Sequence, residues 1–188
     1  MSAPPAIDRF LADGEPGQTV TPSDAGVAAA VRAYLAEARV HLEAIHRQGA
    51  GGQVVNETNS DLIDRLVRRL FRLGEAAYYA SGAEFGQRLT VVAVGGYARR
   101  ELSIHSDVDL LFLYPRRLNP YVESITGRLQ TWLWDGGLTV GSATRTIADT
   151  LDLCNEDATV RTALIDARFL VGDTELFHEL TESLREDT

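Results

Sequence analysis

Two short apolar segments, one ending in a pair of glycines and the next carrying a pair of carboxylates, constrain this chain more than any other feature. Residues 91–94 run into Gly95-Gly96, and ten residues later the second segment begins at Asp107-Val108-Asp109. Side chains alternate along a strand, so Asp107 and Asp109 are expected to face the same way. Adjacent carboxylates repel unless a cation lies between them, and such a pair suits Mg²⁺ carrying a triphosphate.

The segment 108–114 is apolar except at Asp109, which predicts a strand in the middle of a sheet, covered on both faces. An unpaired carboxylate buried there would be costly or would take up a proton. Asp109 therefore needs a metal, an arginine or a strand end open to solvent. The alternative to a metal is an ion pair with Arg99 or Arg100.

The Gly95-Gly96 turn allows positive φ and close approach of backbone N–H groups to a phosphate. A short helix over 97–102 would add an N-terminus that favours an anion. The alternative is an ordinary tight turn after a strand. The spacing matches neither the dinucleotide fingerprint nor the P-loop.

Together these residues resemble the nucleotidyltransferase superfamily that includes DNA polymerase beta. Its pattern is a strand, Gly-Gly or Gly-Ser, about ten residues, and then Asp-x-Asp on the next strand. The longer string over 94–111 is similar to the family of PII uridylyltransferase/uridylyl-removing enzymes, as are residues 134–146 and 158–173. The similarity extends over residues 60–177.

The chain departs from that family pattern at three points. Ala98 and Arg100 replace family glycines, so we expect a stiffer and more basic loop, and Ser142 replaces a histidine. The superfamily generally has a third catalytic carboxylate on a later strand, but residues 138–145 contain none. Either the third ligand comes from elsewhere or the site works with two carboxylates.

The resemblance implies an α/β (α+β) fold, with a small mixed sheet and flanking helices. It also implies transfer of UMP from UTP to a tyrosine of the PII nitrogen-regulatory protein, with release of pyrophosphate. Asp107 and Asp109 would be the catalytic residues and would hold Mg²⁺. The nucleotide-binding residues would be Gly95, Gly96, Arg99, Arg100, Ser106 and Arg145.

Two of these assignments have structural alternatives. Arg145 equally fits a structural ion pair, and His105 is left out of the catalytic set because a histidine in a turn is commonly structural or solvated. At the level of function, one alternative is a relative that adenylylates another protein or a small molecule. Others are a degenerate nucleotide-sensing regulatory module and a scaffold in which the Asp-x-Asp is only a turn.

Composition narrows the class of protein further. The net charge of −9 argues against a nucleic-acid-binding surface, and the single cysteine, Cys154, fits a reducing cytoplasm. No run predicts a membrane span or a signal peptide. The family that the chain resembles is much longer, with HD and ACT domains after the nucleotidyltransferase segment, so we expect this chain to be an N-terminal piece of such a protein.

The chain divides into four predicted parts: a flexible segment (1–22), helices that pack on the core (23–85), the nucleotidyltransferase core (86–147) and C-terminal helices (148–188). The two N-terminal helices are expected over 23–48 and 59–80, the second capped by Asn59 or Ser60. The core is expected to contain strands 89–94, 108–114 and 138–145 and a helix over 120–135. Asp173 is expected to cap the last helix. Four arginines of the second helix are expected to form a solvated face: Arg65, Arg68, Arg69 and Arg72.

Overall fold

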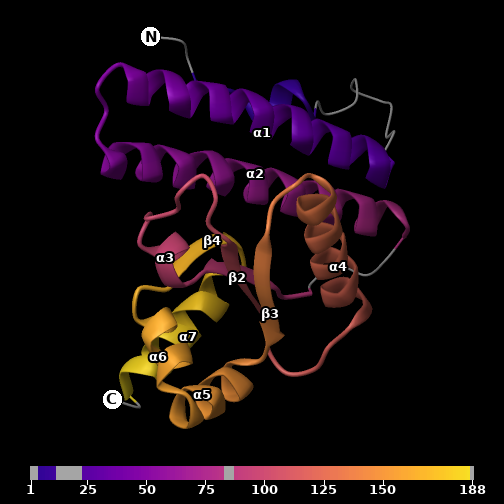
Figure 1. Ribbon diagram of the computed structural model, residues 1–188. Helices are drawn as coiled ribbons and strands as arrows, with labels where there is room; N and C mark the ends of the chain where they lie inside the picture. The colour runs from indigo at the N-terminus through magenta and orange to yellow at the C-terminus, as the bar shows by residue number, and fades with distance from the viewer. Residues whose placement is uncertain (1–3, 12–22, 83–86, 187–188) are drawn as a thin grey trace.

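Two long antiparallel helices lie across one side of the molecule (Figure 1). The computed structural model describes residues 4–11, 23–82 and 87–186. Helix α1 spans Asp24–Arg47 and α2 spans Gly52–Ala80. Ser23 caps α1, because its hydroxyl accepts a hydrogen bond from the Gly26 N–H at 3.2 Å.

Helix α2 begins at Gly52, earlier than the predicted cap at Asn59 or Ser60, so that prediction is wrong. Asn59 lies inside the helix and is buried. Its side-chain amide donates to the carbonyls of Leu102 and Ser103, at 3.0 and 3.3 Å. The Asn59 side chain, which is of a type that often caps helices, thus contacts the loop before β2 instead.

A four-stranded mixed sheet lies beneath the helix pair, with the strand order β3-β2-β1-β4. The strands are β1 (Thr90–Ala93), β2 (Val108–Leu113), β3 (Val140–Arg145) and β4 (Arg168–Gly172). β1 pairs antiparallel with β2 and β4, whereas β2 and β3 are parallel and are joined through α4 (Pro120–Asp135). This confirms the predicted mixed sheet with flanking helices. The fourth strand was not predicted, and it lies outside the expected core of 86–147.

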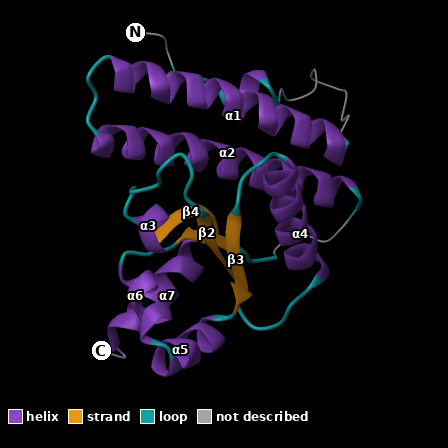
Figure 2. Ribbon diagram, viewed as in Figure 1, coloured by secondary structure: helices purple, strands orange, loops and turns teal. Residues whose placement is uncertain are grey.

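Helices cover both faces of the sheet (Figure 2). On one face, α1, α2 and α4 pack against β2 side chains such as Val108 and Leu110. On the other face, Leu111 and Leu113 pack against α5 (Ile147–Glu156), α6 (Ala158–Ile165) and α7 (Thr174–Glu186). The prediction of a central strand buried on both faces is therefore confirmed.

Side chains cap the first and the last of the closing helices. Thr146 and Asp149 form a reciprocal capping box at the start of α5. Asp173 accepts a hydrogen bond from the Leu176 N–H at 3.0 Å, as expected for the cap of α7. No helix within residues 4–11, 23–82 and 87–186 is long and apolar enough to cross a membrane.

Two predictions about exposed segments need correction. Residues 4–11 are not free of the core: a 3-10 helix, η1 (Ile7–Arg9), places Ile7 and Leu11 against the first helix pair, and both are buried. The rest of the predicted flexible segment, residues 1–3 and 12–22, lies outside the described residues. Two of the four arginines expected to be solvated bind backbone instead, Arg68 to the Leu170 carbonyl and Arg69 to the Leu11 carbonyl.

Candidate active site

The glycine turn places the end of β1 directly beside the Asp109 backbone. The Val94 N–H donates to the Asp109 carbonyl at 3.2 Å, and a short helix, α3 (Gly95–Ala98), follows at once. Gly95 has a φ of +59°, a conformation that L side chains rarely adopt. A Cβ added there would lie 3.5 Å from Asp109 Oδ2. The short helix begins at the glycines themselves and ends at Ala98, so the predicted span of 97–102 is wrong.

A second glycine lies on the other side of the Asp109 carboxylate. In the parallel register of β2 and β3, Asp109 is paired with Gly141. A Cβ at Gly141 would lie only 2.4 Å from Asp109 Oδ1, far inside the normal contact distance. The carboxylate therefore occupies space that a side chain would fill, and it is enclosed between two glycines from different elements.

The electrostatic surroundings of Asp109 favour a cation that the described side chains do not supply. Partial burial, and then the charge of Asp107, raises the pKa of the Asp109 carboxyl. Arg99 pairs instead with Glu101 and lies 3.9 Å from Asp166, while Arg100 pairs with Asp61. The alternative in which Asp109 is neutralised by Arg99 or Arg100 is not the arrangement that the structure adopts.

Asp107, Asp109 and Ser106 line one depression of about 420 Å³, together with Gly96 and His105. Asp107 and Ser106 are exposed, and the Ser106 hydroxyl lies 2.7 Å from the Ser103 hydroxyl. Two carboxylates, a hydroxyl and the glycine turn predicted from sequence are therefore brought to one place. This donor set fits Mg²⁺, which prefers oxygen ligands and commonly uses one or two carboxylates plus substrate phosphates.

The three arginines predicted to bind nucleotide lie in different parts of the structure. The Arg99 guanidinium lies over the glycine turn, because a Cβ at Gly96 would be 3.9 Å from its Nη2. Arg100 extends to Asp61 on α2, and Arg145 pairs in register with Leu113, at the opposite end of β2 from Asp109. Of these three arginines, Arg99 is the one that the structure places beside the glycine turn.

Within the part of the chain that the structure describes, no third acidic ligand completes the site. Among residues 4–11, 23–82 and 87–186, no group of three or more His, Cys, Asp or Glu side chains is arranged to hold a metal ion. Strand β3, where the superfamily pattern would place another carboxylate, presents Gly141 to Asp109 instead. The arrangement is a two-carboxylate site as it stands.

Sequence reasoning missed the polar residues that support the turn. Tyr97 donates to the buried Asp64 of α2, and Arg168 of β4 binds both Asp64 and the carbonyls of Tyr97 and Ala98. Arg168 belongs to the segment 158–173 that resembles the uridylyltransferase family. That resemblance is the sequence signal that could have drawn attention to Arg168. Its contacts join residues 70 or more positions apart, which no local pattern shows.

A mixed sheet with helices on both faces, a Gly-Gly turn after its first strand and paired carboxylates on the next strand define a nucleotidyltransferase domain. Residues 36–154 match the family described as "Putative nucleotidyltransferase DUF294", and the chain belongs to this family. It is also 40% identical over 136 residues to the bifunctional uridylyltransferase/uridylyl-removing enzyme of Erythrobacter litoralis, which covers 72% of this chain and 15% of that protein. A protein of the same description from Rhodospirillum rubrum is 40% identical over 144 residues, 76% of this chain and 15% of the relative. The aligned part of the chain thus spans about a seventh of these relatives.

Proposed function

We propose that this chain carries out Mg²⁺-dependent nucleotidyl transfer, with UTP as the donor and a tyrosine hydroxyl of a PII signal protein as the acceptor. The observation that carries the proposal is the Asp109 carboxylate, which lies between Gly95 and Gly141 beside Asp107 and has no arginine partner among the described residues. The uridylyltransferase description of both relatives supports UTP as the donor. A nucleotide substrate and the single Cys154 also fit a cytoplasmic protein.

In the reaction, the acceptor oxygen attacks the α-phosphorus of UTP, the bond to the pyrophosphate oxygen breaks, and the phenolic proton leaves to solvent or a base. When bound, Mg²⁺ would neutralise charge that develops on the phosphates. Asp107 and Asp109 would hold that ion, and Gly95 and Gly96 let the triphosphate approach the backbone without obstruction by side chains. Arg99, over the turn, is placed to steady the pyrophosphate.

Two alternative functions each follow from a particular feature of the site. An adenylyltransferase would use the same carboxylates, because they contact the phosphates and not the base. A degenerate nucleotide-sensing module is favoured by the lack of a third acidic ligand among the described residues. A nucleotide panel separates the first of these from the proposal, and transfer of label to a PII protein separates the second.

The test is thermal unfolding with UTP, ATP, CTP and GTP, with and without Mg²⁺, in the wild type and in Asp107→Asn/Asp109→Asn. A bound ligand raises the melting temperature. We expect a UTP-selective, Mg²⁺-dependent rise that the double variant loses. An ATP-selective rise would favour adenylyl transfer, and no rise with any nucleotide in a folded chain would overturn the proposal.

A further inference from the structure

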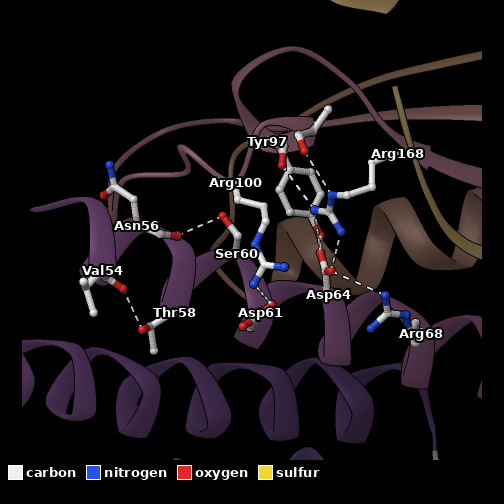
Figure 3. A network of polar contacts seen from close by, with 11 residues as sticks. Val54, Asn56, Thr58, Ser60, Asp61, Asp64, Arg68, Tyr97, Arg100 and Arg168 are labelled. Carbon is white, nitrogen blue, oxygen red and sulfur yellow. Dashed lines mark hydrogen bonds and ion pairs between the residues drawn. The ribbon is translucent and has the colours of Figure 1, made fainter. Parts of the chain in front are cut away.

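The glycine turn is backed by a buried polar network that links α2, α3 and β4 (Figure 3). Its centre is the Asp64 carboxylate, which is 4% exposed. Asp64 accepts hydrogen bonds from the Tyr97 hydroxyl at 2.8 Å, from Arg168 at 2.5 and 3.0 Å, and from Arg68 at 3.4 Å. A buried carboxylate with this many donors is well compensated, so the network is a fixed part of the fold.

Arg168 does more than neutralise Asp64. Its Nε donates to the Ala98 carbonyl at 3.0 Å and its Nη2 to the Tyr97 carbonyl at 3.2 Å. The guanidinium also lies over the Tyr97 ring, 5.4 Å from the centroid. One planar group thus ties the carboxyl end of α3 to both α2 and β4, which a single-point donor such as lysine cannot do.

Helix α3 needs this external support. It has only four residues. The Ala98 and Arg99 N–H groups donate over 3.3 and 3.4 Å, and the shorter backbone bonds, from Arg100 to the Tyr97 carbonyl at 3.1 Å and from Glu101 to the Gly96 carbonyl at 2.9 Å, come from residues beyond the helix. An isolated turn of helix is unstable in water because nucleation costs more than one or two hydrogen bonds return. The same four residues contain Gly95 and Gly96, which have no side chains to fix them.

The neighbouring Arg68 offers a control that distinguishes an effect on the position of α3 from an effect on the stability of the whole fold. It also binds Asp64, and its Nε donates to the Leu170 carbonyl at 2.9 Å. All of these contacts lie on α2 and β4, whereas the contacts of Arg168 extend to α3. Removing either arginine takes one positive charge from the same buried carboxylate.

We infer that Arg168 is a positioning residue that holds the Gly95-Gly96 turn against the Asp109 carboxylate. It acts through the carbonyls of Tyr97 and Ala98, with Asp64 as its anchor. Its consequence for catalysis rests on the proposed function, since the turn is where the triphosphate would bind. The placement of the turn itself is a property of the nucleotide-free chain and is tested there.

The experiment compares hydrogen–deuterium exchange at the Ala98, Arg99, Arg100 and Glu101 amides in the nucleotide-free wild type, Arg168→Gln and Arg68→Gln. Circular dichroism checks that each chain is folded at the temperature used. We expect exchange about tenfold faster or more in Arg168→Gln and within about twofold of wild type in Arg68→Gln. Equal exchange in the two variants would overturn the inference.

Arg168→Lys covers the case in which Arg168→Gln fails to fold, because the lysine keeps a positive charge beside Asp64. We expect this variant to fold but still to exchange its α3 amides faster than wild type, and wild-type exchange would overturn the role of the guanidinium.

Binding of Mg²⁺–UTP and Mg²⁺–ATP to the same variants separates this inference from the proposed function. Weaker binding in the Arg168 variants than in Arg68→Gln is the expected result. If the wild type binds neither nucleotide, the proposed function fails and the exchange data still decide the role of Arg168. If Arg168→Gln exchanges and binds as the wild type does, positioning fails and the proposed function stands.

Discussion

At the scale of single residues, Gly141 leaves the space that the Asp109 carboxylate occupies, and Gly95 supplies the positive φ of the turn beside it. The nearby Arg99 and Arg100 form ion pairs with other acids. Partial burial and the charge of Asp107 raise its pKa, so the folded chain binds a proton there more readily than the unfolded chain does. In the absence of a cation, the charged form of this residue should destabilise the fold.

The sign of this effect predicts the behaviour of Asp109→Asn. The destabilisation is absent below the usual aspartate pKa of about 3.9 and grows as the pH rises through the raised pKa of the folded state. Without divalent cations at pH 7, the variant should melt slightly above the wild type, by less than about 4 °C. The difference should shrink toward pH 4 in a series of melting curves, and a variant that melts below the wild type at pH 7 would show a stabilising partner for the carboxylate.

The two adjacent arginines should differ in their effect on nucleotide binding. Arg99→Gln removes the guanidinium that lies over Gly96, and a charge-assisted hydrogen bond to phosphate is worth about 1.5–3 kcal/mol, so affinity for Mg²⁺–UTP should fall about tenfold or more. Arg100→Gly removes a surface ion pair with Asp61 and should leave affinity within about twofold. Isothermal titration calorimetry measures both, and equal losses would mean that Arg100 leaves Asp61 to bind nucleotide.

Arg100 also explains one departure from the family pattern. It has a φ of +63°, the left-handed conformation that favours glycine, at a position where the resembling family has glycine. Arg100→Gly should therefore relieve backbone strain while losing the exposed pair with Asp61. The two effects are each about 1 kcal/mol, so we expect urea unfolding to change by no more than about that amount.

At the scale of elements, the pairing of β2 with β3 decides the shape of the site. Gly141→Ala places a Cβ 2.4 Å from Asp109 Oδ1, so the carboxylate must move. Because Gly141 does not have positive φ, the backbone tolerates alanine, and we expect a folded chain whose Mg²⁺–UTP affinity falls at least about tenfold, the loss that about 1.4 kcal/mol produces. Titration calorimetry on the purified variant measures this.

Gly127→Ala is the matched control for that substitution. Gly127 lies on an exposed part of α4, and a Cβ there meets nothing within 4 Å. Alanine should leave binding unchanged and stabilise the helix by about 0.5–1 kcal/mol. Unchanged binding in Gly141→Ala as well would mean that the position of the Asp109 carboxylate does not matter.

Elements with local signals were predictable, and those fixed by distant contacts were not. Helix α4 begins at Pro120 and ends at Asp135 as predicted, because Asn119 caps it and glycines follow it. Strand β4 has no clear alternation and depends on pairing with β1, far away in sequence. The same division holds in the site: the glycines and carboxylates were readable, whereas the Asp64–Arg168 support was not.

At the scale of the whole molecule, one sheet is shared by two cores of unequal size. The larger core contains side chains of α1, α2 and α4, and the smaller one contains side chains of α5, α6 and α7. Strand β2 contributes alternate residues to each. Damage to either core should therefore destabilise the strand that carries Asp109.

Leu66→Ala in the larger core and Leu180→Ala in the smaller core test this coupling. Both leucines are fully buried, and such truncations cost about 2–5 kcal/mol. We expect each variant to unfold in urea in a single transition at a lower midpoint, with fluorescence and circular dichroism coincident. A second, separate transition in Leu180→Ala would show that the C-terminal helices unfold independently of the sheet.

The decisive measurement is calorimetric titration of UTP into the wild type, Asp109→Asn and the control Asp152→Asn, with and without Mg²⁺. Asp152 lies exposed on α5, so its substitution removes the same charge away from the site. We predict Mg²⁺-dependent binding that Asp152→Asn retains and Asp109→Asn loses. Binding that is independent of Mg²⁺, or that survives in Asp109→Asn, would contradict a metal-bound nucleotide at these carboxylates.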